Sequence, residues 1–338
     1  MAPSASELGG SKSARKIIGG IWVPTVTFYT DDDEIDVEAT GKHAVRLAQA
    51  GITAMVPLGS YGEGVLVSSE ERSIVTSATR KALDAAGFEH VPVISGVAEQ
   101  SVKNAVAEAK KAAAAGADAI LCVCTSYYRA AINDDVIKSY FTGVADGSPI
   151  PVFVYNYPGV VAGIDISSET LIELAQHPNI IGTKFTCGNS GKLGRVAKAT
   201  KAVGPASGLS GEEPVVADKE YFCVCGMADF LVQGLSVGAG ACICGPANIT
   251  PKTVVKVYEL FKAGKYLEAF AAQQKLTESD YILTALGPEG TKQVLKEVFG
   301  YGGNAHARRP LPNWAEGQVQ AKLADKKIKN YLEQENAM

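Results

Sequence analysis

A single lysine, Lys184, ends an apolar run in the stretch NIIGTKFTCGN at 179–189, and a polar turn that contains glycine follows it. An ammonium group is costly to remove from water, so such a strand either surfaces at the lysine or places the amine for chemistry. Desolvation favours the neutral amine, which attacks a ketone and forms a Schiff base. The resulting iminium withdraws electrons, so a bond to the carbon beyond it can break or form.

Polar or charged turns follow four other short runs, and they read GSYGEG at 59–64, TSYYR at 125–129, YNYPG at 155–159 and SGEE at 210–213. Active sites of parallel α/β barrels lie at the carboxyl ends of the strands. If these runs are strands of such a barrel, all five turns meet at one mouth. Lys184 is then expected at the base of a shared pocket, beside tyrosines.

Cysteine pairs are the other residues that could hold a ligand: Cys122/Cys124, Cys223/Cys225 and Cys242/Cys244. Residues i and i+2 of a strand share a face, so one pair could chelate a metal. Zinc sites use a C-x₂₋₄-C spacing, however, and none of the 4 histidines lies near a pair. We therefore expect small buried thiols and no metal. The odd count of 7 cysteines, without a secretory signal, favours a reducing compartment.

Short apolar runs recur along the chain and are typical of strands that are buried on both faces. They cover 19–28, 53–59, 91–96, 117–124, 150–156, 179–185, 204–211 and 238–245. Helical patterns separate them, for example at 36–51, 69–87 and 101–116, and several of these end on glycine. Eight βα units predict an α/β fold of the (β/α)₈ TIM-barrel type. A doubly wound sheet is the alternative, but no strand precedes a Gly-x-Gly-x-x-Gly turn.

Three regions are expected along the chain. Residues 1–16 are small and polar, lack the apolar centre of a secretory signal and are expected to be a disordered leader, with a mitochondrial presequence left open. Residues 17–249 are expected to form the barrel, and 250–338 a C-terminal helical region packed on it. Apolar residues at 254–261 exceed what one barrel face needs, which predicts contact with a second subunit.

Composition limits the possible partners. The 338 residues are 46% hydrophobic and 20% charged, with a net charge of −4, which is typical of a globular protein. The absence of a long basic run gives little support to nucleic acid or an anionic membrane as a partner. No apolar stretch is long enough to cross a membrane. We therefore expect a cytoplasmic protein that acts on a small molecule.

Three of the turns together resemble one family. GSYGEG, YNYPG and GTKFTCGN, in this order and at barrel spacing, are similar to the signatures of the dihydrodipicolinate synthase / N-acetylneuraminate lyase family of pyruvate-dependent class I aldolases. The resemblance covers about residues 17 to 315. It implies a TIM barrel, a Schiff-base mechanism without a cofactor, a keto-acid substrate and a homotetramer built as a dimer of dimers.

The resemblance also implies roles for individual residues. Lys184 matches the imine-forming lysine, and Tyr155 matches the tyrosine that moves protons to and from the substrate hydroxyl. Ser60 and the N–H groups of Ser60 and Tyr61 match the loop that holds the keto-acid carboxylate. Tyr128 matches a tyrosine that reaches into the site of the neighbouring subunit; packing of Tyr127 and Tyr128 at an interface is the alternative.

Two features of the sequence, one at Val160 and one at Glu212 and Glu213, depart from dihydrodipicolinate synthases or point to another substrate. Val160 occupies the place of the arginine that grips the second substrate's carboxylate. Glu212 and Glu213, expected after the seventh strand, match acidic residues that accept hydrogen bonds from sugar hydroxyls in sugar-acid lyases; a solvated helix start is the alternative.

These departures favour a 2-keto-3-deoxy sugar acid. The resemblance implies 2-keto-3-deoxy-L-galactonate from D-galacturonate catabolism as the substrate, with pyruvate and L-glyceraldehyde as products. A 4-hydroxy-2-oxoglutarate aldolase or an enzyme like dihydrodipicolinate synthase is the enzymatic alternative. A non-catalytic relative that binds a keto acid is the alternative of another class, but the presence of both Lys184 and Tyr155 argues against it.

Overall fold

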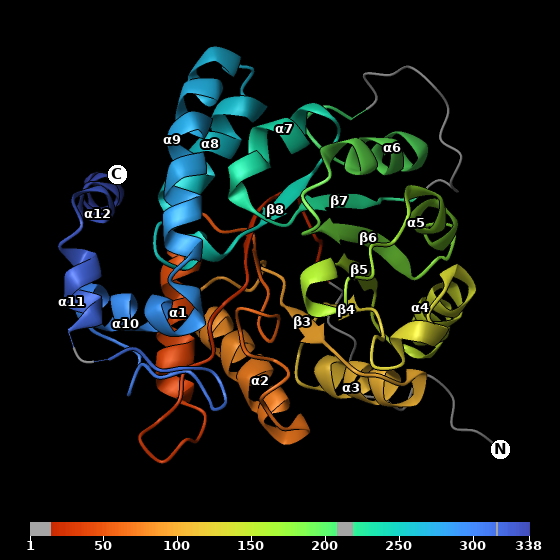
Figure 1. The fold of residues 1–338 in the computed structure, drawn as a ribbon, viewed down its shortest axis with the longest axis horizontal. Helices are drawn as coiled ribbons and strands as arrows, with labels where there is room; N and C mark the ends of the chain where they lie inside the picture. The colour runs from red at the N-terminus through yellow and green to blue at the C-terminus, as the bar shows by residue number, and fades with distance from the viewer. Residues whose placement is uncertain (1–14, 208–218, 316) are drawn as a thin grey trace.

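Eight parallel strands form a barrel at the centre of the computed structural model, which describes residues 15–207, 219–315 and 317–338 (Figure 1). Their order in the sheet is β2-β1-β8-β7-β6-β5-β4-β3, and an isolated parallel bridge between Met55 and Val93 connects the two outer strands. The prediction of a (β/α)₈ barrel is confirmed. The strands are β1 Gly20–Val23, β2 Ala54–Met55, β3 Ile94–Val97, β4 Ala119–Val123, β5 Val152–Asn156, β6 Ile180–Phe185, β7 Phe222–Cys225 and β8 Ala241–Ile243.

Helices surround the barrel, one after each strand. They are α1 Val37–Gln49, α2 Ser69–Ala85, α3 Val102–Ala114, α4 Asp134–Gly147, α5 Ser168–Leu174, α6 Ser190–Thr200, α7 Leu231–Ser236 and α8 Pro251–Lys262. Each of the first six begins after a Ser, Asp or Asn whose side chain accepts a hydrogen bond from a backbone N–H group of the first turn. These caps explain why the helices start directly after the loops at the barrel mouth.

Aromatic side chains fill the inside of the barrel. Trp22 packs edge-on against Phe153, with ring centroids 5.4 Å apart, and lies 5.9 Å from the ring of Phe222. Gly182 makes room for them, because a Cβ atom at this position would lie 2.5 Å from the Phe153 ring and 2.6 Å from the Phe222 carbonyl oxygen. The three rings therefore form a solid floor beneath the residue two positions further along β6, which is Lys184.

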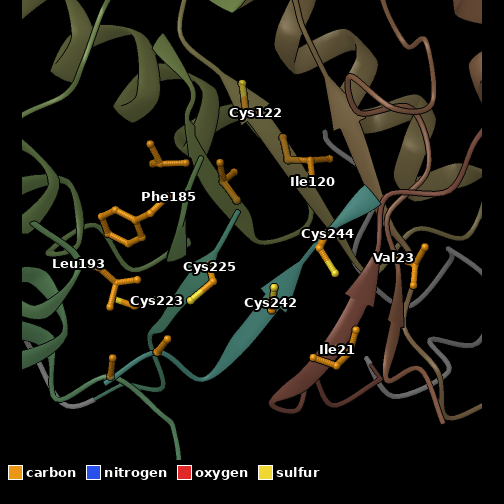
Figure 2. Close-up of a cluster of buried hydrophobic side chains, with 14 of the residues drawn as sticks. Ile21, Val23, Ile120, Cys122, Phe185, Leu193, Cys223, Cys225, Cys242 and Cys244 are labelled. Atoms are coloured by element: carbon orange, nitrogen blue, oxygen red, sulfur yellow. The ribbon is translucent and has the colours of Figure 1, made fainter. Parts of the chain in front are cut away.

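The outward faces of the strands pack against the helices, and this is where the cysteine pairs lie. Figure 2 shows Cys223, Cys225, Cys242 and Cys244 among apolar side chains of neighbouring strands and helices. Burial raises the pKa of Cys122 and of Cys124 to about 12. Metal binding needs the thiolate, so these thiols have the properties of the small core residues that the sequence predicted.

The seventh strand was predicted wrongly at 204–211. Residues 204–207 form a turn, in which the Ser207 N–H group donates to the Gly204 carbonyl oxygen. The strand is Phe222–Cys225, where Phe222 and Val224 face into the barrel while the two cysteines face the helices. Its carboxyl end is therefore followed by Gly226 rather than by the sequence SGEE.

Four further helices lie to one side of the barrel, beside α1 and α8: α9 Tyr266–Thr284, α10 Gly287–Phe299, α11 Gln318–Leu323 and α12 Lys326–Ala337 (Figure 1). The expected apolar surplus at 254–261 is covered within the subunit, because Val254, Tyr258 and Phe261 are buried in the main core. The large exposed apolar residues of this region lie instead on α9, with Leu267 83% exposed and Tyr281 79% exposed.

A buried ion pair connects this C-terminal region to the barrel. Lys292 of α10 and Glu63 of the loop after β2 lie 2.7 Å apart, Nζ to Oε1, and both side chains are 0% exposed. The Lys292 ammonium group also donates to the carbonyl oxygens of Thr27 and His306, and the second Glu63 oxygen accepts from the Arg308 N–H group. One cation and one anion thus join two mouth loops to the C-terminal region.

No helix in the described residues is long and apolar enough to cross a membrane.

We predict that Lys292→Met lowers the free energy of unfolding by about 3–5 kcal/mol, because the Glu63 carboxylate stays buried without its cation. The double variant Lys292→Met/Glu63→Gln removes both charges and should regain most of this loss. Urea unfolding followed by circular dichroism measures both. Lys42→Met, which breaks an exposed pair with Glu38, is the control and should have no measurable effect. If the single and double variants lose the same free energy of unfolding, the unpaired Glu63 carboxylate is not the cause of the loss.

Candidate active site

The loop after β2 has an unusual backbone. Leu58 has a φ of 64° and Glu63 a φ of 53°, a left-handed conformation that side chains other than glycine rarely adopt. The buried Glu63 side chain is held by its ion pair, which stabilises the strained residue. Within the described residues, the N–H groups of Ser60 and Tyr61 donate to no protein acceptor. Two oriented donors at the barrel mouth remain available for a small anion.

The glycines of this loop are required by close packing around Leu58. A Cβ atom at Gly64 would lie 1.9 Å from the Leu58 carbonyl oxygen, and one at Gly96 would lie 2.1 Å from the same atom. At Gly62 it would lie 2.7 Å from the Leu58 nitrogen. The glycines thus hold Leu58 in place, whereas Gly59 has nothing within 4 Å of its Cβ position.

Lys184 and Tyr155 lie side by side because their strands pair in register, with Tyr155 on β5 opposite Lys184 on β6. The Lys184 Nζ atom is 4.2 Å from the centroid of the Tyr155 ring. Lys184 is only 5% exposed and Tyr155 4%. In the described part of the chain the Lys184 amine has neither a carboxylate nor a hydrogen-bond partner, unlike Lys292, and it lies over the face of the Tyr155 ring.

The hydroxyl group of Tyr155 points toward the loop after β2. Its oxygen lies 3.5 Å from Ser60 Oγ, which is the outer limit of a hydrogen bond. The structure therefore brings together three of the predicted residues, Lys184, Tyr155 and Ser60, at the carboxyl ends of three strands. A buried amine, a phenol and an alcohol in this arrangement can form an imine and move a proton beside it.

The loop after β5 is fixed by Asn156. Its side-chain amide nitrogen donates to Asp165 Oδ1 at 2.9 Å. Its side-chain oxygen, Oδ1, accepts from the backbone N–H group of Ile166 at 3.1 Å. Asp165 also pairs with Lys192 of α6. These contacts hold the YNYPG turn in a short arc, which places Val160 at the rim of the mouth, 46% exposed.

Tyr127 and Tyr128 are at the surface. They are 80% and 75% exposed, and their rings pack edge to face with centroids 5.1 Å apart. The side-chain oxygen of Gln100 anchors their loop by accepting from the N–H groups of Ser126 and Tyr127, both at 2.9 Å. Within one subunit, Tyr128 is therefore not brought to Lys184 and does not line the cavity.

Tyr61 contributes its backbone only. Its ring packs over Gly245, where a Cβ atom would lie 2.5 Å from the ring, and its hydroxyl group lies 3.5 Å from Thr291 Oγ1 of α10. Burial raises the pKa of Tyr61 to about 12. The Tyr61 side chain does not line the cavity.

Glu212 and Glu213 lie outside the described residues, so their prediction has no structural outcome. The premise behind it is wrong, however, because strand seven ends at Cys225 and Gly226 and Met227 follow it. The sequence also gave no sign of the Lys292–Glu63 pair or of Gln100. Glu63 stood within a quoted motif, but nothing in the sequence pointed to its partner 229 positions away.

A cavity of about 320 Å³ opens at the mouth of the barrel. Its polar lining residues come from the loops after β2, β3 and β4 and from β5 itself, and they comprise Ser60, Glu63, Gln100, Ser126 and Tyr155. Its rim is apolar and comprises Val65, Leu66, Val160, Val161, Pro310 and Leu311. The volume suits a small organic acid rather than a nucleotide. Among the described residues, no group of three or more His, Cys, Asp or Glu side chains could hold a metal ion.

Known proteins are similar to this chain in sequence and in fold. Residues 17–329 match the Dihydrodipicolinate synthetase family. The chain is 44% identical over 327 residues to the L-threo-3-deoxy-hexylosonate aldolase of Aspergillus niger, covering 94% of this chain and 96% of that protein. It is 39% identical to a protein of Emericella nidulans named a probable mitochondrial 4-hydroxy-2-oxoglutarate aldolase, covering 88% and 90%. A crystal structure of a protein assigned to the dihydrodipicolinate synthase family from Coccidioides immitis superposes with a TM-score of 0.76 at 31% identity, covering 96% and 98%.

We predict that Gly64→Ala destabilises the protein by about 1–3 kcal/mol and lowers its thermal midpoint, because the added methyl group collides with the Leu58 carbonyl oxygen. Gly59→Ala, in the same loop but with open space at its Cβ position, is the matched control and should unfold at the wild-type temperature. Differential scanning fluorimetry compares the three proteins. If Gly64→Ala also unfolds at the wild-type temperature, the loop does not pack against Leu58 as described.

Proposed function

This chain belongs to the dihydrodipicolinate synthetase family, and we propose that it is a Schiff-base aldolase that cleaves a 2-keto-3-deoxy sugar acid. The substrate that we propose is 2-keto-3-deoxy-L-galactonate, with pyruvate and L-glyceraldehyde as products. The relative from Aspergillus niger, similar over almost the whole chain, carries a matching name. One structural observation supports the proposal above all, namely the buried pairing of Lys184 with Tyr155 inside the barrel.

The proposed reaction begins at Lys184. Its neutral amine adds to the keto carbon, and loss of water forms an iminium ion. Tyr155 takes the proton from the C4 hydroxyl group; the C3–C4 bond then breaks, the aldehyde leaves, and the electron pair moves to the iminium nitrogen as an enamine. Protonation at C3 and addition of water release pyruvate and regenerate the amine. Ser60, 3.5 Å from the Tyr155 hydroxyl oxygen, is placed to relay the proton toward the mouth.

The substrate carboxylate is proposed to bind the loop after β2. The free N–H groups of Ser60 and Tyr61 are the donors, and the close packing around Leu58 fixes their direction. Fixed donors bind an anion without a cost for ordering them. This places C1 of the substrate beside Ser60 and C2 above the floor formed by the barrel aromatics.

The far end of the cavity favours a substrate with one carboxylate. Val160 stands where dihydrodipicolinate synthases have an arginine, and the rim around it is apolar. A second carboxylate there would be left without a cation, which is costly. Arg129, in the turn after β4, donates from its Nε atom to the Ala162 carbonyl oxygen at 3.2 Å and does not line the cavity. 4-Hydroxy-2-oxoglutarate, suggested by the name of the Emericella nidulans relative, is the alternative substrate.

The assembly and location of the enzyme are also proposals. We propose a homotetramer built as a dimer of dimers, in which Tyr128 enters the site of a neighbouring subunit. The exposure of the Tyr127–Tyr128 pair supports this, since two rings are rarely left in water without a use. Sedimentation velocity distinguishes this from a monomer. We propose a cytoplasmic location, although the relative from Emericella nidulans is named as mitochondrial.

We predict that borohydride added with pyruvate traps a covalent adduct on Lys184, because reduction of the imine makes the bond permanent. Peptide mass spectrometry locates the adduct. The matched control residue is Lys192, an equally buried lysine on α6 whose amine pairs with Asp165 and should stay unmodified. Failure to trap would remove the Schiff-base mechanism and leave the non-catalytic alternative, whereas an adduct on another lysine would overturn the assignment of Lys184.

We predict that Tyr155→Phe lowers kcat by about 10²–10⁴-fold with much less effect on KM, because the ring stays while the proton carrier is lost. Tyr157→Phe is the control, since its ring stacks on that of Tyr155 at 5.7 Å without reaching Ser60. Steady-state release of pyruvate, coupled to lactate dehydrogenase, measures both variants. Near-normal turnover in Tyr155→Phe would show that Tyr155 only packs against Lys184.

A further inference from the structure

A segment of the C-terminal region returns to the barrel mouth and becomes part of the cavity. It follows α10, runs through residues 300–315 and is drawn in blue in Figure 1. Pro310 and Leu311 of this segment line the cavity together with Val160 and with Val65 and Leu66 of the loop after β2. The wall thus combines residues that are about 150 to 245 positions apart in the sequence.

Arg308 fixes this segment to the barrel. Its guanidinium group forms a two-point contact with Glu71, 2.8 Å for each of the two N–H···O pairs. It also donates to Asp33 Oδ1 at 3.2 Å, to the Asp33 carbonyl oxygen and to the Leu66 carbonyl oxygen at 3.3 Å. These contacts use all five N–H donors of the side chain. None is left for a substrate, so Arg308 holds the wall but is not a carboxylate receptor.

The backbone of the same segment is tied to the buried ion pair. The Arg308 N–H group donates to Glu63 Oε2 at 2.7 Å, and the His306 carbonyl oxygen accepts from Lys292. The side-chain and backbone contacts therefore fix His306 and Arg308, four and two positions before Pro310. The position of the wall follows from these contacts and not from packing of Leu311, which is 36% exposed.

The chemistry of the wall selects the end of the substrate that meets it. Val65, Val160, Pro310 and Leu311 offer no charge and no side-chain hydrogen-bond donor. Arg309, which lies between Arg308 and the wall residues Pro310 and Leu311, does not line the cavity. A neutral hydroxymethyl end can keep its contact with water at the rim, whereas a carboxylate loses hydration there and gains no partner.

We propose that Pro310 and Leu311 are specificity-determining residues that contact the end of the substrate farthest from its keto group, and that Arg308 is the positioning residue of this wall. The inference rests on the aldolase function proposed above. In the proposed orientation the pyruvate part of the substrate lies at the end lined by Ser60 and Tyr155, carbons four to six lie at the wall, and pyruvate bound alone stays at the Ser60 end.

The first test compares Leu311→Ala with Leu267→Ala, an exposed leucine of α9 outside the cavity. Leu311→Ala should raise KM for 2-keto-3-deoxy-L-galactonate by about three- to tenfold, less than a fully enclosed apolar contact would give, with kcat within about twofold of wild type. Leu267→Ala should change neither constant. An unchanged KM in Leu311→Ala would overturn the assignment of the wall.

The second test reverses the preference. Leu311→Arg places a cation where the far end of the substrate lies, and should raise the ratio of kcat/KM for 4-hydroxy-2-oxoglutarate to that for 2-keto-3-deoxy-L-galactonate by about tenfold or more. The same ratio in wild type and variant would show that Leu311 does not face the far end. Leu311 is exposed, so the substitution leaves the core intact.

The third test separates positioning from folding. Arg308→Lys keeps the charge but loses the two-point contact with Glu71, and Arg309→Lys makes the same change one position along, in a residue that does not line the cavity. Arg308→Lys should raise KM for the sugar acid about as much as Leu311→Ala, with kcat little changed, while Arg309→Lys behaves as wild type. A fall in kcat without a rise in KM would overturn the positioning role.

Borohydride trapping with pyruvate distinguishes failure of the proposed aldolase function from failure of the proposed role of the wall. Every variant at 308, 309 and 311 should be trapped at the wild-type rate, because pyruvate does not reach the wall. If wild type itself is not trapped, the aldolase function fails. If all proteins are trapped and no KM or ratio changes, the aldolase function stands and the wall does not determine specificity.

Discussion

The architecture of the mouth depends on one buried ion pair. Lys292 and Glu63 are both fully enclosed, and burial lowers the pKa of Lys292 while the Glu63 carboxylate offsets part of this effect. A buried pair of this kind contributes little net stability compared with apolar packing, but it tolerates no loss of either partner. Its value lies in geometry, because the pair sets the left-handed backbone of the loop after β2 and also anchors the C-terminal segment that returns to the cavity. The same ion pair thus holds both the loop proposed to bind the substrate carboxylate and the C-terminal segment that lines the cavity.

The reactive pair is determined by the barrel itself. Parallel strands in register place Tyr155 next to Lys184 without any loop contribution, and Gly182 admits the Phe153 ring beneath them. The loop after β2 then adds backbone donors for the carboxylate that all keto acids share, while an apolar corner after β5 and a wall from the C-terminal region meet the end that differs between substrates. This division explains how one barrel can keep imine chemistry constant while the far end of the cavity changes.

The sequence was most informative where a strand and its loop motif are continuous. Apolar runs predicted the barrel, and the resemblance of the motifs at the strand ends predicted the three side chains that meet in it, Lys184, Tyr155 and Ser60. It failed at the seventh strand, because regular spacing favoured 204–211, although glycine, proline and serine dominate there. The alternation of Phe222 and Val224 with two cysteines was the better signal, because two buried thiols alternating with apolar residues are typical of a strand that is buried on both faces. The wall at 310–311 could not be predicted, since its place depends on contacts with residues more than 200 positions away.

The final helix also has a part in the barrel. No side chain of its own residues caps the start of α8. Instead the carboxylate of Glu335 on α12 accepts hydrogen bonds from the N–H groups of Lys252 and Thr253, at 2.8 and 2.9 Å, and from the Thr253 hydroxyl group. The helix that follows the last strand therefore acquires its cap only from a residue 82 positions later. During synthesis on a ribosome, the emerging barrel has to wait with α8 uncapped until nearly the whole of this sequence has left the exit tunnel, so folding of the native barrel is completed after translation of α12 rather than of β8.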